Sequence, residues 1–184
     1  MTSTHNESYV LPHNFEKYVG KAYLKSFKCF HLNVRSVKNK ESDLFLFFEQ
    51  LNQEFDVIML TETWSTDDTN VFRLPSYNTF YVNRSSGRGG GICILVKKAL
   101  NCTLIQTFSA ITSDYEFLAL ELQNMILAVC YRPPNGTMTP FLDYLETFLC
   151  YVNKNNLDLI CGGDVNINML ANDSSKMRLD VLLN

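Results

Sequence analysis

The chain has 184 residues, of which 46% are hydrophobic and 19% charged, and its formal net charge at pH 7 is −3. This length suits one domain, and the composition excludes a disordered polymer because enough apolar side chains are present to form a core. The slightly negative charge excludes a strongly basic domain that holds nucleic acid mainly by attraction to phosphates.

The sequence shows neither a secretion signal nor a membrane span. Its longest apolar run, Met125 to Tyr131, is far shorter than the roughly 20 residues of a spanning helix, and the polar residues 1–8 do not resemble a signal peptide. The six cysteines form no Cys-x-x-Cys pair, and most lie in apolar runs. This pattern is typical of reduced core thiols, so we expect an intracellular protein, nuclear or cytoplasmic, that is not secreted and has no membrane partner.

The first part of the chain has an α/β pattern. Residues 1–26 are weakly periodic and form an N-terminal segment, and the domain is expected over residues 27–184. A buried strand is predicted at 27–34, a helix from Ser42 to Phe55, and a second buried strand at 56–62. The alternation of strand, helix and strand indicates an α/β fold.

The second part of the chain is dominated by strands. Short turns separate strand-like segments, which favours antiparallel pairing; the segments are 77–82, 91–96, 102–108, 116–122 and 125–131. A helix is predicted from Thr139, with Pro140 in its first turn, and a buried strand at 157–161. Met177, Val181 and Leu182 indicate one face of a short third helix.

Three of the predicted buried strands end in side chains with oxygen donors, namely Asn33, Glu62, and Asp164 with Asn166. Ligands of layered α/β folds gather at the carboxyl ends of strands, so we expect these side chains to form one site. Such a donor set suits Mg²⁺ better than zinc, and a carboxylate beside the metal can activate water. The alternative is that each residue only caps a strand or turn, where Asn and Asp are common.

Five short motifs then occur in a recognisable order: Leu32-Asn33-Val34-Arg35-Ser36, Thr61-Glu62-Thr63-Trp64, Gly89-Gly90-Gly91-Ile92, Tyr131-Arg132-Pro133-Pro134-Asn135 and Gly163-Asp164-Val165-Asn166. The series resembles the endonuclease domain of non-LTR retrotransposons, within the endonuclease/exonuclease/phosphatase superfamily that also contains apurinic/apyrimidinic endonucleases. The similarity runs from about Tyr9 to the last residue. It implies a four-layer α/β sandwich in which two mainly antiparallel sheets are flanked by helices.

The resemblance also implies a role for each matching residue. Glu62 would be the principal ligand of Mg²⁺, for which Mn²⁺ can substitute, and Asn33 would lie beside it in the metal site. Asp164 would position or deprotonate the attacking water, Asn166 would orient Asp164 and the phosphate, and Tyr131 would reach the scissile phosphate or the leaving oxygen. Arginines that would contact the DNA backbone are Arg35, Arg84 and Arg88.

Family members nick one DNA strand and leave a 3′ hydroxyl, which primes reverse transcription in a whole element, so the resemblance also implies fusion to a reverse transcriptase. The family's later motifs, an aspartate in a strand and a final Ser-Asp-His, have no match here, so we expect a domain that lacks its last strands. Three functions stay open: a magnesium-dependent DNA endonuclease, an inactive retrotransposon-derived fragment, and a phosphatase of the same superfamily.

Overall fold

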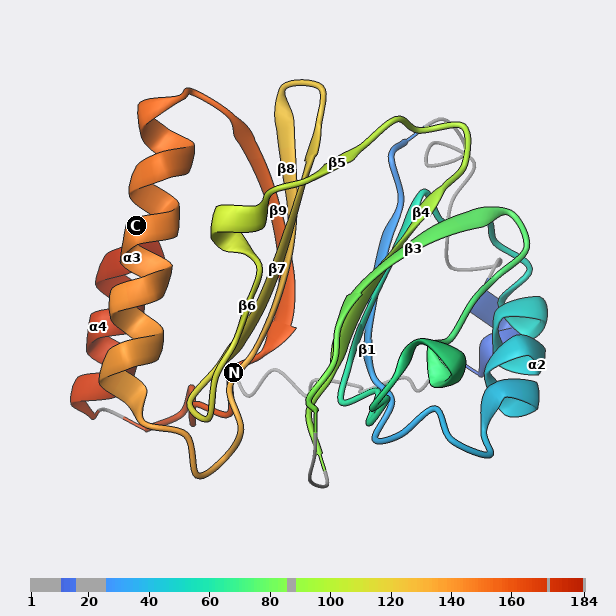
Figure 1. Cartoon of the computed structure of the whole chain (residues 1–184), viewed down its shortest axis with the longest axis horizontal. Helices are drawn as coiled ribbons and strands as arrows, with labels where there is room; N and C mark the ends of the chain where they lie inside the picture. Colours follow the sequence, from blue (N-terminus) through green and yellow to red (C-terminus); the bar gives the residue numbers. More distant parts are fainter. Residues whose placement is uncertain (1–10, 16–25, 86–88, 172, 184) are drawn as a thin grey trace, which may run out of the picture.

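A computed structural model of the chain describes residues 11–15, 26–85, 89–171 and 173–183 (Figure 1). It contains two mixed β-sheets and the helices α2, α3 and α4. Arg88 and Tyr9, which the sequence singled out, lie outside the described residues. In the described part of the chain, no helix is long and apolar enough to cross a membrane.

The first sheet has the strand order β1-β2-β4-β3. Its strands are β1 (Cys29–Asn33), β2 (Val57–Thr61), β3 (Tyr77–Val82) and β4 (Ile92–Lys97). The edge pair β1 and β2 is parallel and is connected by helix α2 (Glu41–Leu51), whereas the other pairs are antiparallel. This confirms the strand–helix–strand prediction for the first part of the chain.

The second sheet has the order β5-β7-β8-β9, with β6 paired to β7. Its strands are β5 (Thr103–Leu104), β6 (Ala110–Ile111), β7 (Glu116–Leu122), β8 (Met125–Tyr131) and β9 (Asp158–Asp164). Helix α3 (Met138–Lys154) connects the parallel pair β8 and β9. Both sheets therefore have a parallel strand pair at one edge, and each pair is joined by a crossover helix.

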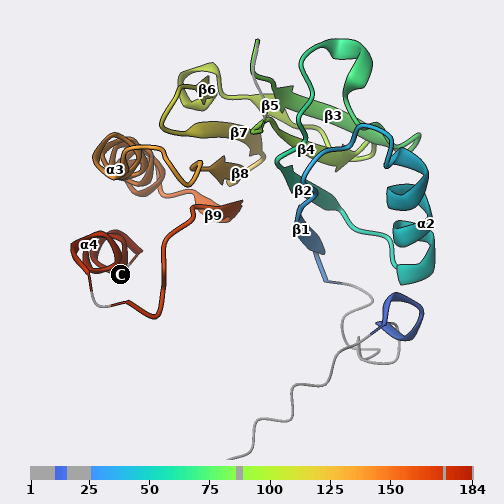
Figure 2. The ribbon, with the colours of Figure 1, turned by 90° about the horizontal axis from the view of Figure 1, so that it is seen from below.

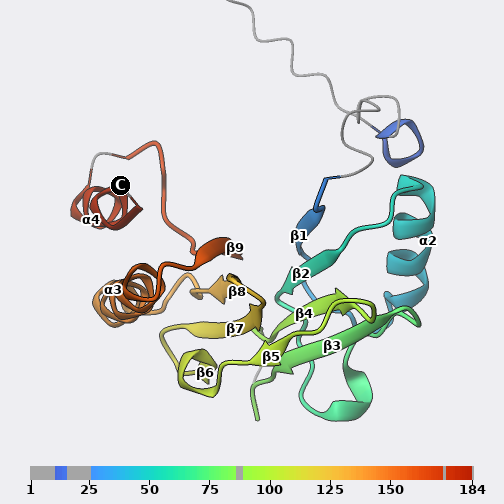
Figure 3. The same ribbon diagram turned by 90° about the horizontal axis from the view of Figure 1, so that it is seen from above.

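The two sheets face each other and the helices lie outside them (Figures 2 and 3). Helix α2 covers the outer face of the first sheet, and α3 and α4 (Ser174–Leu183) lie on the outer side of the second. The predicted four-layer α/β sandwich is thus confirmed. Short 3-10 helices at Pro12–Asn14 (η1), Asp68–Asn70 (η3) and Gln106–Phe108 (η4) complete the described elements.

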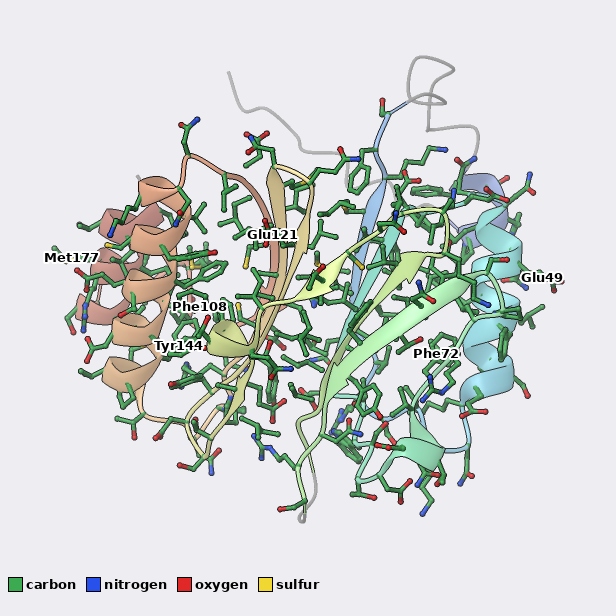
Figure 4. All side chains as sticks on the ribbon, turned by 45° about the horizontal axis from the view of Figure 1, so that its top comes forward. Glu49, Phe72, Phe108, Glu121, Tyr144 and Met177 are labelled. Atoms are coloured by element: carbon green, nitrogen blue, oxygen red, sulfur yellow. The ribbon has the colours of Figure 1, made fainter. Side chains whose placement is uncertain are left out.

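Three apolar clusters fill the spaces between the layers. The cluster between the sheets contains the fully buried Ile94, Leu118 and Leu127, and strands with both faces covered are expected to be apolar throughout. Figure 4 shows Phe108 and Tyr144 between the second sheet and α3, where their ring centroids lie 6.1 Å apart. These layers hold the strand ends in fixed positions relative to each other.

The structure corrects several local predictions. The segment 102–108 is not one strand: η4 follows the two-residue β5 and turns Phe108 into the α3 cluster. In α4 the predicted apolar face is wrong for two of its three residues: Met177 and Val181 are 62% and 76% exposed, whereas Leu182 packs against the α3 cluster, in which Leu179 is buried. The prediction of core cysteines is also wrong for half of them, since the exposed ones are Cys29, Cys150 and Cys161.

Candidate active site

The carboxyl ends of β1, β2 and β9 reach the same edge of the sandwich, the lower edge in Figure 1. Asn33 is the last residue of β1 and pairs with Thr61 of the parallel strand β2, so Glu62 follows at the same level. Asp164 ends β9 and pairs with Tyr131 of β8 in the second sheet. The parallel pairs β1–β2 and β8–β9 therefore bring the predicted site residues to one end of the molecule. These residues are Asn33, Glu62, and Asp164 with Asn166.

Asn33 joins the two sheets at this edge. Its Nδ2 donates to Oε1 of Glu62 over 2.9 Å and to Oδ2 of Asp164 over 2.8 Å, and its Oδ1 accepts from the backbone N–H of Arg35. The two carboxylates thus converge on one amide. We had placed Asn33 beside Glu62 in the metal site, and in this structure its nitrogen, rather than its oxygen, faces the carboxylates.

Glu62 lies in a turn with an unusual backbone. Its φ is +56°, as is that of Trp64, a conformation that side chains other than Gly, Asn and Asp seldom adopt. The N–H groups of Thr63 and Trp64 donate to the carbonyls of Gly91 and Gly90, and the indole Nε1 of Trp64 donates to Oε2 of Glu62 over 3.3 Å. The glycine run therefore supports the backbone of the central carboxylate.

Tyr131 is buried beside Glu62. Burial raises the pKa of its phenol to about 12, with a further contribution from the negative charge of Glu62 and a hydrogen bond to that carboxylate. At neutral pH the phenol therefore keeps its proton and acts as a donor. The structure therefore places Tyr131 next to Glu62, and its contact with a phosphate stays a prediction.

Asp164 and Asn166 form a turn held by Arg132. The backbone N–H of Asn166 donates to Oδ1 of Asp164 over 3.2 Å, and the Asn166 amide donates to the Arg132 carbonyl over 2.8 Å. The guanidinium of Arg132, buried at 5% exposure, donates in return to the carbonyls of Val165 and Asn166. Asn166 therefore orients Asp164 through its backbone, while its side chain is engaged with Arg132.

Arg132 also holds the next turn of the chain, because its Nη1 donates to the carbonyls of Pro133 and Gly136. Four carbonyl partners satisfy this buried cation, whose pKa burial lowers. Arg132 belongs to the motif Tyr131-Arg132-Pro133-Pro134-Asn135, and no role was predicted for it. Its position directly after the strand that ends in Tyr131 is the feature of the sequence that could have indicated a role at the site.

Glu116 is a site residue that sequence reasoning missed. Its carboxylate is fully buried at the start of β7, opposite Tyr131 in the strand register. It accepts from Nε of Arg84 over 2.5 Å and from the backbone N–H of Gly91 over 2.7 Å. Burial raises the pKa of Glu116, and the guanidinium of Arg84 opposes that shift. The sign of it in the sequence was a charged residue at the first position of a mostly apolar strand.

The three predicted DNA-contacting arginines have different surroundings. Arg35 is exposed beside Asn33, with a φ of +44°. Arg84 turns toward Glu116, and its side chain keeps only 24% exposure. Arg88 lies outside the described residues.

His31 lies close to the site and has a structural role. Its Nε2 lies 3.3 Å from the hydroxyl of the buried Thr61, and burial lowers its pKa. A Cβ added at Gly162 would lie 3.4 Å from Cβ of His31 and 2.9 Å from Sδ of Met59. The first sheet therefore packs closely against β9 at this point, which explains why a glycine is placed there.

The chemistry of the cluster fits a hard divalent cation. Glu62 and Asp164 offer carboxylate oxygens that share one amide, and neither forms a salt bridge with Lys or Arg in the described part of the chain. Oxygen donors with free lone pairs are what Mg²⁺ and Mn²⁺ prefer. The described residues contain no group of three His, Cys, Asp or Glu side chains that could hold a metal. Any ion here would keep several water ligands.

Comparison with known families gives one match: the profile of the Endonuclease/Exonuclease/phosphatase family covers residues 31–183. This range includes every site residue described above. A comparison of the sequence with curated proteins finds no significant match.

Solved structures share the fold at low sequence identity. The endonuclease domain of TRAS1, a telomere-specific non-LTR retrotransposon, superposes with a TM-score of 0.60 at 14% identity, over 85% of this chain and 69% of that one. The AP endonuclease LMAP from Leishmania major gives 0.56 at 13% identity, over 84% and 64%. The 3′ phosphatase NExo from Neisseria, bound to a product DNA hairpin, gives 0.54 at 11% identity, over 86% and 70%. The chain therefore spans about two thirds of the length of these proteins.

Proposed function

The chain belongs to the endonuclease/exonuclease/phosphatase family, and we propose that it hydrolyses phosphodiester bonds in DNA with a divalent metal ion held mainly by Glu62, with Asn33 beside it in the metal site. The observation that carries this proposal is the convergence of Glu62 and Asp164, from two different sheets, on the amide of Asn33. Two carboxylates at one point repel each other unless a cation or a proton lies between them. A bound metal removes that repulsion.

Mg²⁺, or Mn²⁺ in its place, would supply a Lewis acid that stabilises charge on a phosphoryl oxygen. Glu62 would provide the main ligand oxygen. Asn33 would hold Glu62 and Asp164 at their present separation, since its amide donates to both. These residues come from rigid strand ends, which keeps the geometry of the site constant as substrate binds.

Asp164 is the residue we assign to the attacking water. Its Oδ1 accepts from the backbone of Asn166 and its Oδ2 accepts from Asn33, so both oxygens are fixed in direction. A carboxylate held in this way can orient water and take its proton. Tyr131, a neutral phenol beside Glu62, would donate a hydrogen bond to the scissile phosphate or to the leaving oxygen.

DNA is the substrate we propose, with contacts from Arg35, Arg84 and Arg88. Support comes from the likeness to solved structures that are described as DNA-processing, among them one bound to a DNA hairpin. Arg35 is exposed within two residues of Asn33, where a phosphate held at the site would pass. Contacts to the backbone would position the strand without reading its bases.

The biological role we propose is the nick that starts target-primed reverse transcription, in a protein that also carries a reverse transcriptase. The order of the five motifs supports this role, as does the likeness to a retrotransposon endonuclease domain. Hydrolysis that leaves a 3′ hydroxyl would provide the primer. Location in the nucleus or cytoplasm, without secretion, belongs to the same proposal.

A second candidate activity is removal of a terminal phosphate, which the likeness to a 3′ phosphatase favours. The same metal and the same attacking water would serve both reactions, because only the leaving group differs. The third reading, an inactive fragment, rests on the absence from the sequence of a Ser-Asp-His motif. Plasmid nicking separates the endonuclease from the other two, and release of a terminal phosphate from DNA separates the phosphatase from the inactive fragment.

The test is nicking of supercoiled plasmid by the purified chain with Mg²⁺ or Mn²⁺, beside Glu62→Gln and Asp164→Asn. Circular dichroism first establishes that each protein is folded. We expect relaxed circles from the wild-type chain and a loss of about 10²- to 10³-fold in both variants. A folded wild-type chain that leaves the plasmid intact with either metal would overturn the proposal and leave the phosphatase and the inactive fragment.

A further inference from the structure

Glu116 lies where the two sheets meet, behind the carboxylate cluster. It begins β7 in the second sheet, yet its Oε2 accepts from the N–H of Gly91, which leads into β4 of the first. Arg84 follows β3 and pairs with Oε1 of the same carboxylate. One buried side chain therefore ties together three segments that are distant in the sequence.

The contacts continue from this carboxylate to Glu62. The Gly91 carbonyl accepts from the N–H of Thr63 over 3.0 Å, and the Gly90 carbonyl accepts from the N–H of Trp64 over 2.8 Å. These two bonds hold the segment in which Glu62 and Trp64 both have φ +56°. A conformation of this kind persists only when its surroundings hold it in place.

We infer that Glu116 is a positioning residue for Glu62, acting through the glycine turn and kept in place by its ion pair with Arg84. This inference rests on the proposed function, because Glu62 is the proposed metal ligand. Glu116 touches neither substrate nor metal in this account. It sets the direction of the Glu62 carboxylate, and an outer-shell contact of this kind typically changes metal affinity by about 10- to 100-fold.

The space around Gly90 supports a tight fit between turn and ion pair. A Cβ added there would lie 2.1 Å from Oε1 of Glu116 and 2.4 Å from Nε of Arg84, closer than any real Cβ contact. The φ of Gly90 is +74°, which also favours glycine. The turn and the buried pair are thus packed directly against each other, so a movement of Glu116 would move the turn.

Trp64 gives this inference a spectroscopic readout. It is the only tryptophan of the chain, it lies within the supported turn, and its indole donates to Glu62. Its emission therefore reports the state of the turn without metal. Quenching of that emission by Mn²⁺ reports binding at Glu62, independently of any cleavage.

The experiment uses the full chain as wild type, Glu116→Gln and Glu62→Gln, with Glu121→Gln as the matched control. Glu121 is an exposed residue of the same strand, and Figure 4 shows it away from the edge at which β9 ends. Arg84 and Gly91 donate to different oxygens of Glu116, so a glutamine at position 116 turns its NH2 group, which is a donor, toward one of them and loses that bond. Urea unfolding establishes that each variant is folded.

We expect Glu116→Gln to shift the metal-free emission of Trp64 and to weaken Mn²⁺ binding by about 10-fold or more. Glu121→Gln should match the wild type in both measurements. A folded Glu116→Gln chain with unchanged emission and with Mn²⁺ affinity within about twofold of wild type would overturn the inference. A shift in emission alone, with unchanged Mn²⁺ affinity, would also overturn it, because Glu116 would then support the turn without positioning the ligand.

The variants Glu62→Gln and Glu116→Gln distinguish a failure of the proposed function from a failure of this inference. If Glu62→Gln binds Mn²⁺ as tightly as wild type, the proposed metal site is wrong, whatever Glu116 does. If Glu116→Gln does not fold, Arg84→Lys replaces it, since a lysine keeps a cation beside the carboxylate but lacks the fork that fixes its direction. A folded Arg84→Lys chain supports the inference if both signals change, and contradicts it if either is unaltered.

Discussion

Asn33 at the end of β1 and Asp164 at the end of β9 are 131 residues apart in the chain, yet Nδ2 of Asn33 donates to Oδ2 of Asp164 over 2.8 Å. The bond crosses from one sheet to the other. The same nitrogen donates to Glu62, so one amide sets the distance between the two carboxylates of the site. The geometry of the site therefore depends on the packing of the sheets as well as on the strands themselves.

Asn33→Ala should lower the nicking rate by about 10- to 100-fold, because removing the amide leaves the two carboxylates without their shared donor. The rate of plasmid relaxation at saturating Mg²⁺ measures this. Asn78→Ala, which changes an exposed asparagine of β3, is the matched control. A rate for Asn33→Ala equal to that of the control would show that the bridge between the carboxylates is dispensable.

Arg132→Lys should lower the free energy of unfolding by about 2–4 kcal/mol, since a lysine cannot reach all four carbonyls that the guanidinium satisfies and a lost bond to a charged group costs about 1.5–3 kcal/mol. Urea denaturation followed by circular dichroism gives the value. The exposed Arg73→Lys is the control. Equal midpoints for the two variants would mean that the carbonyls of Val165, Asn166, Pro133 and Gly136 find other partners.

Asp114 should make stability depend on pH in the acid range. Its Oδ1 accepts from the backbone N–H of Thr137, the N-cap residue of α3, and this bond lowers the pKa of Asp114 below its ordinary value of 3.8. A lowered folded-state pKa means that the stabilisation is present above about pH 4 and is lost as the pH falls through the folded-state value.

Asp114→Asn should therefore be less stable than wild type at pH 7, and the difference should shrink as the pH falls below about 4. Urea midpoints of both proteins across this range measure it. The exposed Asp158→Asn should show a smaller difference at every pH. A gap between wild type and Asp114→Asn that stays constant down to acid pH would contradict the assignment.

Cysteine reactivity should separate the buried and exposed thiols. Burial raises the pKa of Cys93 to about 12, so at pH 8 only about one molecule in ten thousand carries the thiolate. Cys150 is exposed on α3. Mass spectrometry after brief treatment with iodoacetamide should find Cys150 alkylated and Cys93 unmodified until urea is added. Equal labelling of both in the native chain would place Cys93 outside the core.

The site could be predicted from the sequence wherever its residues end apolar strands. Asn33, Glu62 and Asp164 were visible because a polar side chain interrupts a buried run, and parallel neighbours finish at the same edge. The structure confirms that they converge. Glu116 was not visible in this way, because its partners Arg84 and Gly91 come from the other sheet and the sequence does not show which strands face each other.

The fold, like the site, could be predicted from the sequence in part. The strands and helices followed from apolar periodicity and the four layers from the family resemblance, but β9 extends through Gly162 and Gly163, beyond the strand predicted at 157–161. A Cβ at Gly163 would lie 2.2 Å from the carbonyl oxygen of Cys130, so glycine marks close packing there rather than a turn. In α4, helical spacing placed Met177 on the core face, whereas contact with α3 turns Leu179 inward.

The most direct test of the proposed site is cleavage of a 5′-labelled DNA duplex with Mg²⁺, resolved to single nucleotides, by wild type and Asp164→Asn. We expect the wild-type chain to make internal cuts that leave 3′ hydroxyls which a DNA polymerase can extend, and the variant to lose about 10²-fold or more of this activity. Equal cutting by both proteins would contradict the role of Asp164. Release of terminal phosphate alone would assign the site to the phosphatase reaction.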